Sequence, residues 1–95
     1  METIDEISIS WTEGDIETVK ELDKVVLSKG LWTTILFRYQ EWQPASESYS
    51  KDKYTIRRYK KKNGRYAQQS KFTISSPEQA QKIIDALNNW IGKLS

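Results

Sequence analysis

A two-residue turn between two strand-like runs is the feature that most constrains the fold of this chain. Asn63 and Gly64 are the residue pair best able to adopt the two positive φ angles of a tight β-hairpin turn. The chain on either side has strand character, so the sequence predicts two antiparallel strands over residues 53–62 and 65–75. From Lys53 to Pro77 there are eight lysines and arginines and no acidic residue. The predicted hairpin is therefore strongly cationic.

The strongest strand prediction covers residues 31–42, which are rich in β-branched and aromatic side chains. Alternate side chains of a strand lie on opposite faces. One face is a predicted core and consists of Leu31, Thr33, Ile35, Phe37 and Tyr39. The other face consists of Trp32, Thr34, Leu36, Arg38, Gln40 and Trp42, a composition suited to stacking on bases. A second interpretation stays open, in which Trp32 and Trp42 pack under a loop or at a subunit interface.

The same alternation assigns two faces to the predicted hairpin. Its apolar side chains are a predicted part of the core: Tyr54, Ile56, Phe72 and Ile74. The opposite face would then be one continuous basic surface, made of Arg57, Tyr59, Lys61, Arg65, Gln69 and Lys71.

A helix is predicted over residues 77–92. Ser76 can cap it, Pro77 suits its first position, and Gln79 lies where a capping box takes Glu or Gln. Apolar residues then recur at steps of three and four: Ala80, Ile83, Ile84, Leu87, Trp90, Ile91 and Leu94. We expect this amphipathic helix to pack on one face of the sheet, and its spacing would also suit contact with a second copy of the chain.

The N-terminal part of the chain is acidic, with eight acidic residues and one base within residues 1–23. Ile7, Ile9 and Trp11 alternate with polar residues, which predicts a short strand or an ordered acidic arm over residues 1–15. This arm could also lie against the basic hairpin and shield it.

The chain is expected to form one domain, residues 1–95, because 95 residues suffice for one modest core. We predict an α+β fold with an antiparallel sheet of four or five strands over residues 22–75, followed by the C-terminal helix. The conformation of residues 13–24 stays open, since their apolar spacing is nearly helical while their β-branched residues favour a strand.

The composition excludes several classes of chemistry. There is no cysteine and no histidine, so disulfides, thiolate zinc sites, imidazole metal sites and histidine-based catalytic triads are excluded. No glycine-rich phosphate loop is present.

No apolar run approaches the ~20 residues of a membrane span, and no leader sequence opens the chain. We expect a protein that is not an enzyme, has no cofactor, metal or small-molecule substrate, and is cytoplasmic (nucleoid-associated) or nuclear rather than secreted or membrane-bound.

Residues 54–91 resemble a known family. The resemblance rests on the runs Tyr54-Thr55-Ile56-Arg57-Arg58-Tyr59 and Lys71-Phe72-Thr73-Ile74-Ser75, followed by Ser76-Pro77-Glu78-Gln79 and the amphipathic helix. They are similar to the single-stranded-DNA-binding domain of the transcriptional coactivator PC4. The resemblance implies a curved antiparallel sheet backed by the helix, a homodimer, and single strands held along basic, aromatic channels. Arg57, Tyr59 and Lys71 match basic or aromatic positions of that motif. Gln68-Gln69-Ser70 replaces the family's glycine-containing basic turn, and the N-terminal half has no match.

The predicted function is binding of single-stranded nucleic acid without sequence specificity, DNA more than RNA, in transcription or DNA maintenance. Cations would neutralise phosphates, and aromatic rings would stack on unpaired bases. The predicted binding residues are Trp32, Arg38, Trp42, Arg57, Tyr59, Lys61, Arg65 and Lys71. The alternative is a protein–protein interaction module that uses the aromatic sheet face and the helix stripe as its interface. In either case a homodimer is expected.

Overall fold

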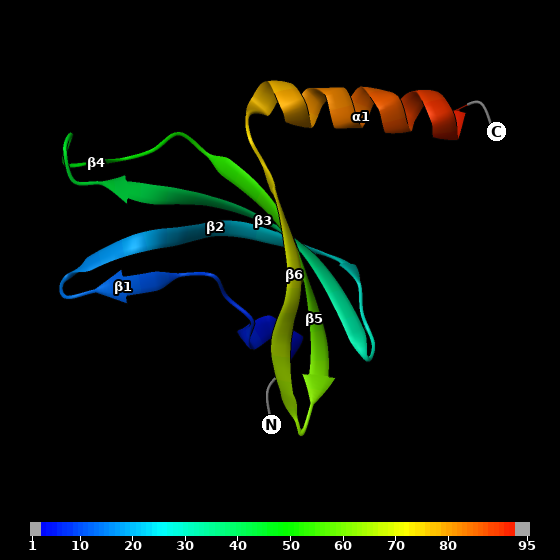
Figure 1. Cartoon of the computed structure of the whole chain (residues 1–95), viewed down its shortest axis with the longest axis horizontal. Coiled ribbons are helices and arrows are strands. Elements are labelled where there is room, and N and C mark those ends of the chain that lie inside the picture. Colours follow the sequence, from blue (N-terminus) through cyan, green and yellow to red (C-terminus); the bar gives the residue numbers. More distant parts are fainter. Residues whose placement is uncertain (1–2, 93–95) are drawn as a thin grey trace.

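The computed structural model describes residues 3–92 and has the predicted α+β class. A curled antiparallel half-barrel sheet is followed by a single C-terminal helix (Figure 1). The sheet order is β1-β2-β3-β5-β6, and the short β4 pairs with β3. The elements are η1 (Ile4–Glu6), β1 (Trp11–Glu13), β2 (Ile16–Ser28), β3 (Trp32–Gln43), β4 (Ser48–Tyr49), β5 (Lys53–Lys62), β6 (Arg65–Ile74) and α1 (Pro77–Gly92).

The predicted hairpin turn is confirmed. Asn63 and Gly64 have φ angles of 51° and 76°, which are the two positive values that a tight turn of this kind requires. Strands β5 and β6 pair antiparallel from this turn outward, with Lys62 opposite Arg65. The pairing has one irregularity, between Arg58 and Tyr59. The cationic run is therefore a long, twisted two-stranded unit at one edge of the sheet.

Strand β2 begins at Ile16, before the predicted start of the sheet at residue 22. Its register with β3 shifts between Glu21 and Asp23 and again between Val26 and Ser28. Each shift is a β-bulge, where an extra residue interrupts the two-residue period of a strand. These interruptions explain why the apolar spacing of this segment resembles that of a helix.

The core lies on one face of the sheet and is completed by residues 4–9, which we call the N-terminal segment. Ile7 and Ile9 are buried against Ile35, Phe37 and Tyr59. On β3 the predicted core face is confirmed, with Thr33, Ile35, Phe37 and Tyr39 buried. Leu31 is the exception, because it precedes the strand and is exposed.

The predicted faces of the hairpin are wrong. Thr55 and Tyr59 are buried, while Tyr54 and Ile56 are only half-buried and Phe72 is exposed. The cause is the register with β3, in which Phe37 lies opposite Thr55, and residues opposite each other share a face. Ile74 is buried as predicted, although on the other face.

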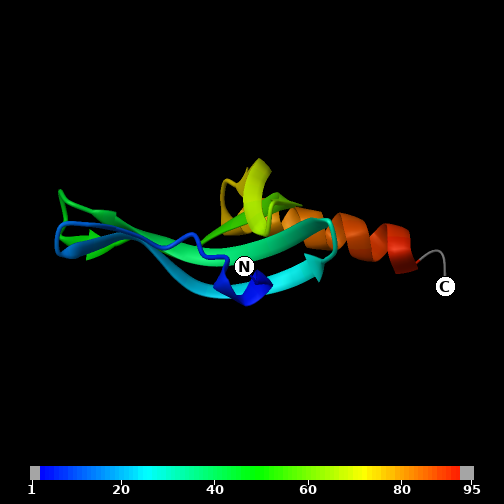
Figure 2. The same cartoon turned by 90° about the horizontal axis from the view of Figure 1, so that it is seen from below.

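The start of α1 is as predicted. The Gln79 amide N–H donates to Ser76 Oγ at 3.1 Å, and the Gln79 side chain accepts a hydrogen bond from the Ser75 amide at 2.6 Å. The helix contacts the sheet at β6, with Ala80 and Ile83 half-buried. Beyond this contact it projects away from the sheet (Figures 1 and 2).

The apolar stripe of α1 is exposed along the projecting part of the helix. Its exposed members are Ile84, Leu87, Trp90 and Ile91, each between 47% and 64% exposed. Leu94, a predicted member of the stripe, lies outside the described residues. The projecting helix gives the molecule principal extents of 51 × 39 × 17 Å and a radius of gyration of 15.6 Å. A compact chain of this length has a radius of gyration of about 12 Å.

Candidate functional site

Like charges lie directly opposite each other on the β5–β6 hairpin. Arg57 pairs with Lys71 and Lys62 pairs with Arg65 in the cross-strand register. Such pairs destabilise a sheet, because the two charges repel. Within residues 3–92 the ion pairs are Arg38–Asp52 and Lys53–Glu41, so no carboxylate neutralises the hairpin cations from 57 to 71. The hairpin therefore holds a concentration of positive charge that the described residues do not compensate.

One face of the hairpin continues the core side of the sheet, and we call it the inner cationic face. It consists of Arg57, Lys61, Tyr66, Gln68 and Lys71, which the register places on the side of Thr55. Arg57 Nη1 donates to Gln68 Oε1 at 3.1 Å, whereas its Nε is buried without a hydrogen-bond partner. Lys61 Nζ lies 5.6 Å from the centre of the Tyr66 ring. This face combines three cations with an aromatic ring.

Gln69, which the sequence also places on this surface, is in the irregular part of the β5–β6 pairing. Its side-chain amide donates to the Ala67 carbonyl at 3.1 Å. Arg65 lies opposite Lys62 beside the turn, so the register places it on the face opposite to the inner cationic face, contrary to the prediction.

The opposite face of the hairpin brings cations onto Trp32. The guanidinium carbon of Arg58 lies 4.4 Å from the centre of a Trp32 ring, and Lys60 Nζ lies 5.3 Å from it. The sequence predicted Arg57 and Lys61 as binding residues but not Arg58 and Lys60. The predicted assignment of faces, which is wrong, placed Arg58 and Lys60 on the core side of the hairpin. Trp32 remains 39% exposed, so its ring is partly available beside two cations.

Tyr59 is not an exposed ring, contrary to the prediction. Only 6% of its surface is exposed, and it lies in the core with Ile35 and Phe37. A base cannot stack on a ring in this position, so Tyr59 contributes to the fold instead.

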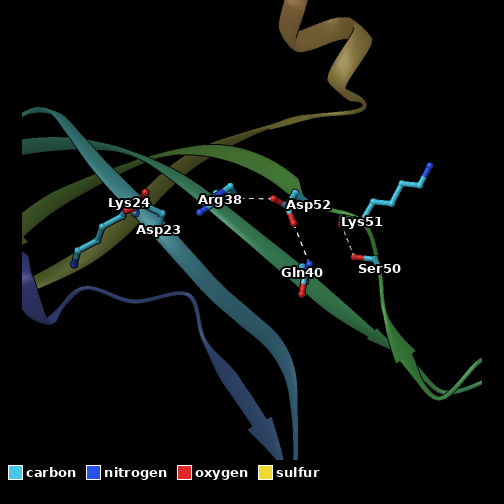
Figure 3. A network of polar contacts seen from close by, with 7 residues as sticks. All are labelled: Asp23, Lys24, Arg38, Gln40, Ser50, Lys51 and Asp52. Atoms are coloured by element: carbon cyan, nitrogen blue, oxygen red, sulfur yellow. Dashed lines mark hydrogen bonds and ion pairs between the residues drawn. The ribbon is translucent and has the colours of Figure 1, made fainter.

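Arg38 is held in a polar network beside the loop that precedes β5 (Figure 3). Its Nη1 lies 3.2 Å from Asp52 Oδ2, and the second oxygen of Asp52 accepts a hydrogen bond from Gln40 Nε2 at 3.0 Å. Asp23 lies opposite Arg38 on β2. With two carboxylates near it, this guanidinium is much less available for a phosphate than the hairpin cations are.

Trp42 packs against Tyr49. The two ring centres are 5.2 Å apart at an interplanar angle of 73°, which is an edge-to-face arrangement. Trp42 is half-buried, and this contact joins β3 to β4. The arrangement agrees with the open interpretation in which Trp42 packs under a loop.

A groove of about 570 Å³ lies at the end of the inner cationic face. It is bounded by the N-terminal segment, the end of β2 and the hairpin. Its lining residues are Thr3, Ile4, Asp5, Val26, Leu27, Ser28, Lys29, Lys61 and Tyr66. Two of them, Lys61 and Tyr66, also belong to the inner cationic face, so the groove and this face are continuous.

Metal ligands do not gather in the part of the chain that the structure describes: no three acidic, histidine or cysteine side chains lie close enough to hold an ion. Among the helices of residues 3–92, none has the length and apolar character that crossing a bilayer requires.

Comparison with known proteins gives no match, whether with family models, curated proteins or solved structures. The resemblance of residues 54–91 to PC4 therefore stays a prediction.

Proposed function

We propose that this protein binds single-stranded nucleic acid, DNA in preference to RNA and without sequence specificity, through the inner cationic face. The observation that carries the proposal is the Arg57–Lys71 pair, in which two cations face each other and neither forms an ion pair with a carboxylate of residues 3–92. A phosphate between them would convert their repulsion into two charge-assisted contacts. Such contacts release counterions and favour no particular base.

Unpaired bases suit this surface better than a duplex does. Tyr66 lies beside Lys61 on the inner cationic face, and Trp32 lies beside Arg58 on the opposite face. Their rings can stack only on bases that are not already stacked within a duplex. The exposed stripe of α1 is apolar, so the helix does not suit the reading of a DNA groove. A nucleic-acid partner in transcription or DNA maintenance fits a nucleoid-associated cytoplasmic location or a nuclear one.

The test compares affinities for a labelled oligo-dT over a range of salt concentrations. In the double variant Arg57→Gln with Lys71→Gln, the affinity falls and the slope of log K against log salt becomes flatter by about 0.7, the value for one phosphate of a single strand that is no longer neutralised. The matched control, Lys51→Gln with Lys82→Gln, removes the same charge from exposed positions outside the hairpin and keeps the wild-type slope. Wild-type affinity and slope in the hairpin variant would show that this face does not bind the strand. An oligo-rU of the same length measures the preference for DNA.

A second candidate function, self-association through α1, is favoured by the exposed apolar stripe of this helix. The chain exposes 7047 Å², compared with about 5,700 Å² for a compact monomer of its mass. This excess is of the size that a stable protein–protein interface buries. We propose a homodimer in which the stripe is covered by the second copy.

Sedimentation velocity tests the dimer. Leu87→Glu with Trp90→Glu should give a monomer of unchanged helix content, because both side chains are exposed in the single chain. Asn88→Glu with Asn89→Glu adds the same charge beside the stripe and should leave the dimer intact. A wild-type chain that sediments as a monomer at millimolar concentration overturns this proposal and leaves the binding proposal untouched.

A further inference from the structure

The groove at the end of the inner cationic face has the size and walls of a ligand site. Its volume of about 570 Å³ lies within the range of pockets that bind small organic groups. Ile4, Val26 and Leu27 make its apolar wall, and Tyr66 supplies an aromatic side. Val26 and Leu27 are 38% and 53% exposed, so apolar surface is open to solvent there.

The wall formed by the N-terminal segment is fixed by one side chain. The Lys24 ammonium donates to the carbonyl oxygens of Ile4, Asp5 and Ile7 at 3.1, 3.0 and 2.7 Å. These bonds use all three donors of the ammonium group. Ile7 and Ile9 anchor the same segment in the core. The groove is thus a fixed part of the fold, because the segments on both of its sides are held in place.

The apolar wall and the Tyr66 ring suit a neutral flat group, and the lining cations suit an anion attached to it. Lys61 and Lys29 line it together with Asp5. Asp5 adds a negative charge to this lining, and a phosphate at Lys61 would continue the line of the Arg57–Lys71 pair. Lys61 follows Arg57 by four residues along β5, a separation of about 13 Å in an extended strand.

We propose that the groove receives one nucleobase of the bound single strand, while its phosphate stays on Lys61. The base lies between the Tyr66 ring and the apolar wall at Val26 and Leu27. This inference rests on the proposed function and adds a site where a base, and not only the backbone, is bound. One inserted base fixes the position of the strand on a surface that otherwise binds by charge alone.

The experiment compares two ligands that carry the same number of phosphates, an oligo-dT and an oligomer of abasic deoxyribose phosphates. The wild-type protein should bind oligo-dT about tenfold or more tightly than the abasic oligomer, the range expected for stacking of one base on an aromatic ring. Tyr66→Ala and Leu27→Asn should each reduce this ratio several-fold and leave the salt slope unchanged. Val25→Asn, at an exposed position of the same strand outside the groove, is the control and should keep the wild-type ratio.

The outcomes separate this inference from the function on which it rests. If the wild-type protein binds neither ligand, the proposed function fails. If it binds both equally, or if the preference survives Tyr66→Ala and Leu27→Asn, the strand is bound but no base enters the groove.

A second measurement needs no variant. In wild-type protein the amide resonance of Leu27, on the apolar wall away from Lys61, should shift on addition of oligo-dT and stay in place on addition of the abasic oligomer. Equal shifts with both ligands would overturn the inference.

Discussion

The ammonium of Lys24 lies 2.7 Å from the carbonyl oxygen of Ile7, and this contact joins the middle of the sheet to the segment that covers its core. Ile7 is 4% exposed and would lose its position if the segment detached. Hydrogen bonds from a charged group are stronger than neutral ones. The ammonium group of Lys24 therefore stabilises the segment that covers the core.

Lys24→Met should lower the free energy of unfolding by about 2 kcal/mol, because the variant keeps the aliphatic stem and loses the three hydrogen bonds. Urea unfolding followed by tryptophan fluorescence measures the change. Lys51→Met, at an exposed position that forms no ion pair with another described residue, should stay within about 0.5 kcal/mol of the wild type. Equal stability of the two variants would mean that the N-terminal segment is held by its apolar contacts alone.

Tyr59→Ala should lower the unfolding free energy by about 3 kcal/mol, because it removes a buried aromatic ring and leaves a cavity. In a domain of this size the midpoint of thermal unfolding would fall by about 12 °C or more. Trp32→Ala removes a larger ring that is 39% exposed and should cost less than half as much. A variant at Tyr59 that melts like the wild type would contradict the buried position of this ring.

Lys71→Gln should stabilise the free protein by about 0.5 kcal/mol at low salt, because it removes the charge opposite Arg57. The gain should shrink at high salt, where the repulsion is screened. Chemical unfolding at two salt concentrations gives both values. Lys82→Gln on α1 removes the same charge away from the hairpin and should give no such gain. Destabilisation by Lys71→Gln at low salt would show that the pair does not repel.

Lys53 provides a test of pH dependence. Its hydrogen bond with Glu41 raises the pKa of Lys53 above the ordinary value of 10.5. Because the folded-state pKa is the higher one, the contribution of the pair to stability is present below about pH 10.5 and is lost as the pH rises through the folded-state pKa. Both side chains are 45% exposed, so water screening keeps this contribution small.

The side-chain carbon resonances of Lys53 report the titration directly. Their midpoint should be lower in Glu41→Gln than in the wild type, since the variant lacks the carboxylate that favours the ammonium form. Identical midpoints would contradict the assigned cause.

Features that depend on neighbouring residues could be predicted from the sequence. The positive φ angles at Asn63 and Gly64 follow from the turn preferences of those two residues. The start of α1 follows from Ser76 and Gln79 in the same way. The two faces of β3 follow from its strict alternation, which no bulge interrupts in the pairing with β5.

Features that depend on distant contacts could not be predicted. Apolarity favours Tyr54 and Ile56 as core residues, but the register with β3 and the cover supplied by Ile7 and Ile9 bury Tyr59 instead. In the candidate site, the cationic character of the hairpin is local and could be predicted from the sequence. The pairing of Arg38 with Asp52 joins residues 14 positions apart through a loop, and no local pattern indicates it.

The bulge at Leu22 makes the length of β2 as important as its composition. Upstream of it Val19 and Glu21 lie opposite Glu41 and Tyr39, and downstream Lys24 lies opposite Phe37. If the upstream pairing and the bulge are kept, inserting one residue between Leu22 and Lys24 would place Lys24 opposite Leu36, on the far side of the sheet. A change that conserves every charge and nearly all apolar surface would then leave the N-terminal segment without its anchor. The number of residues that precede Lys24 in this strand therefore decides on which face of the sheet its side chain lies.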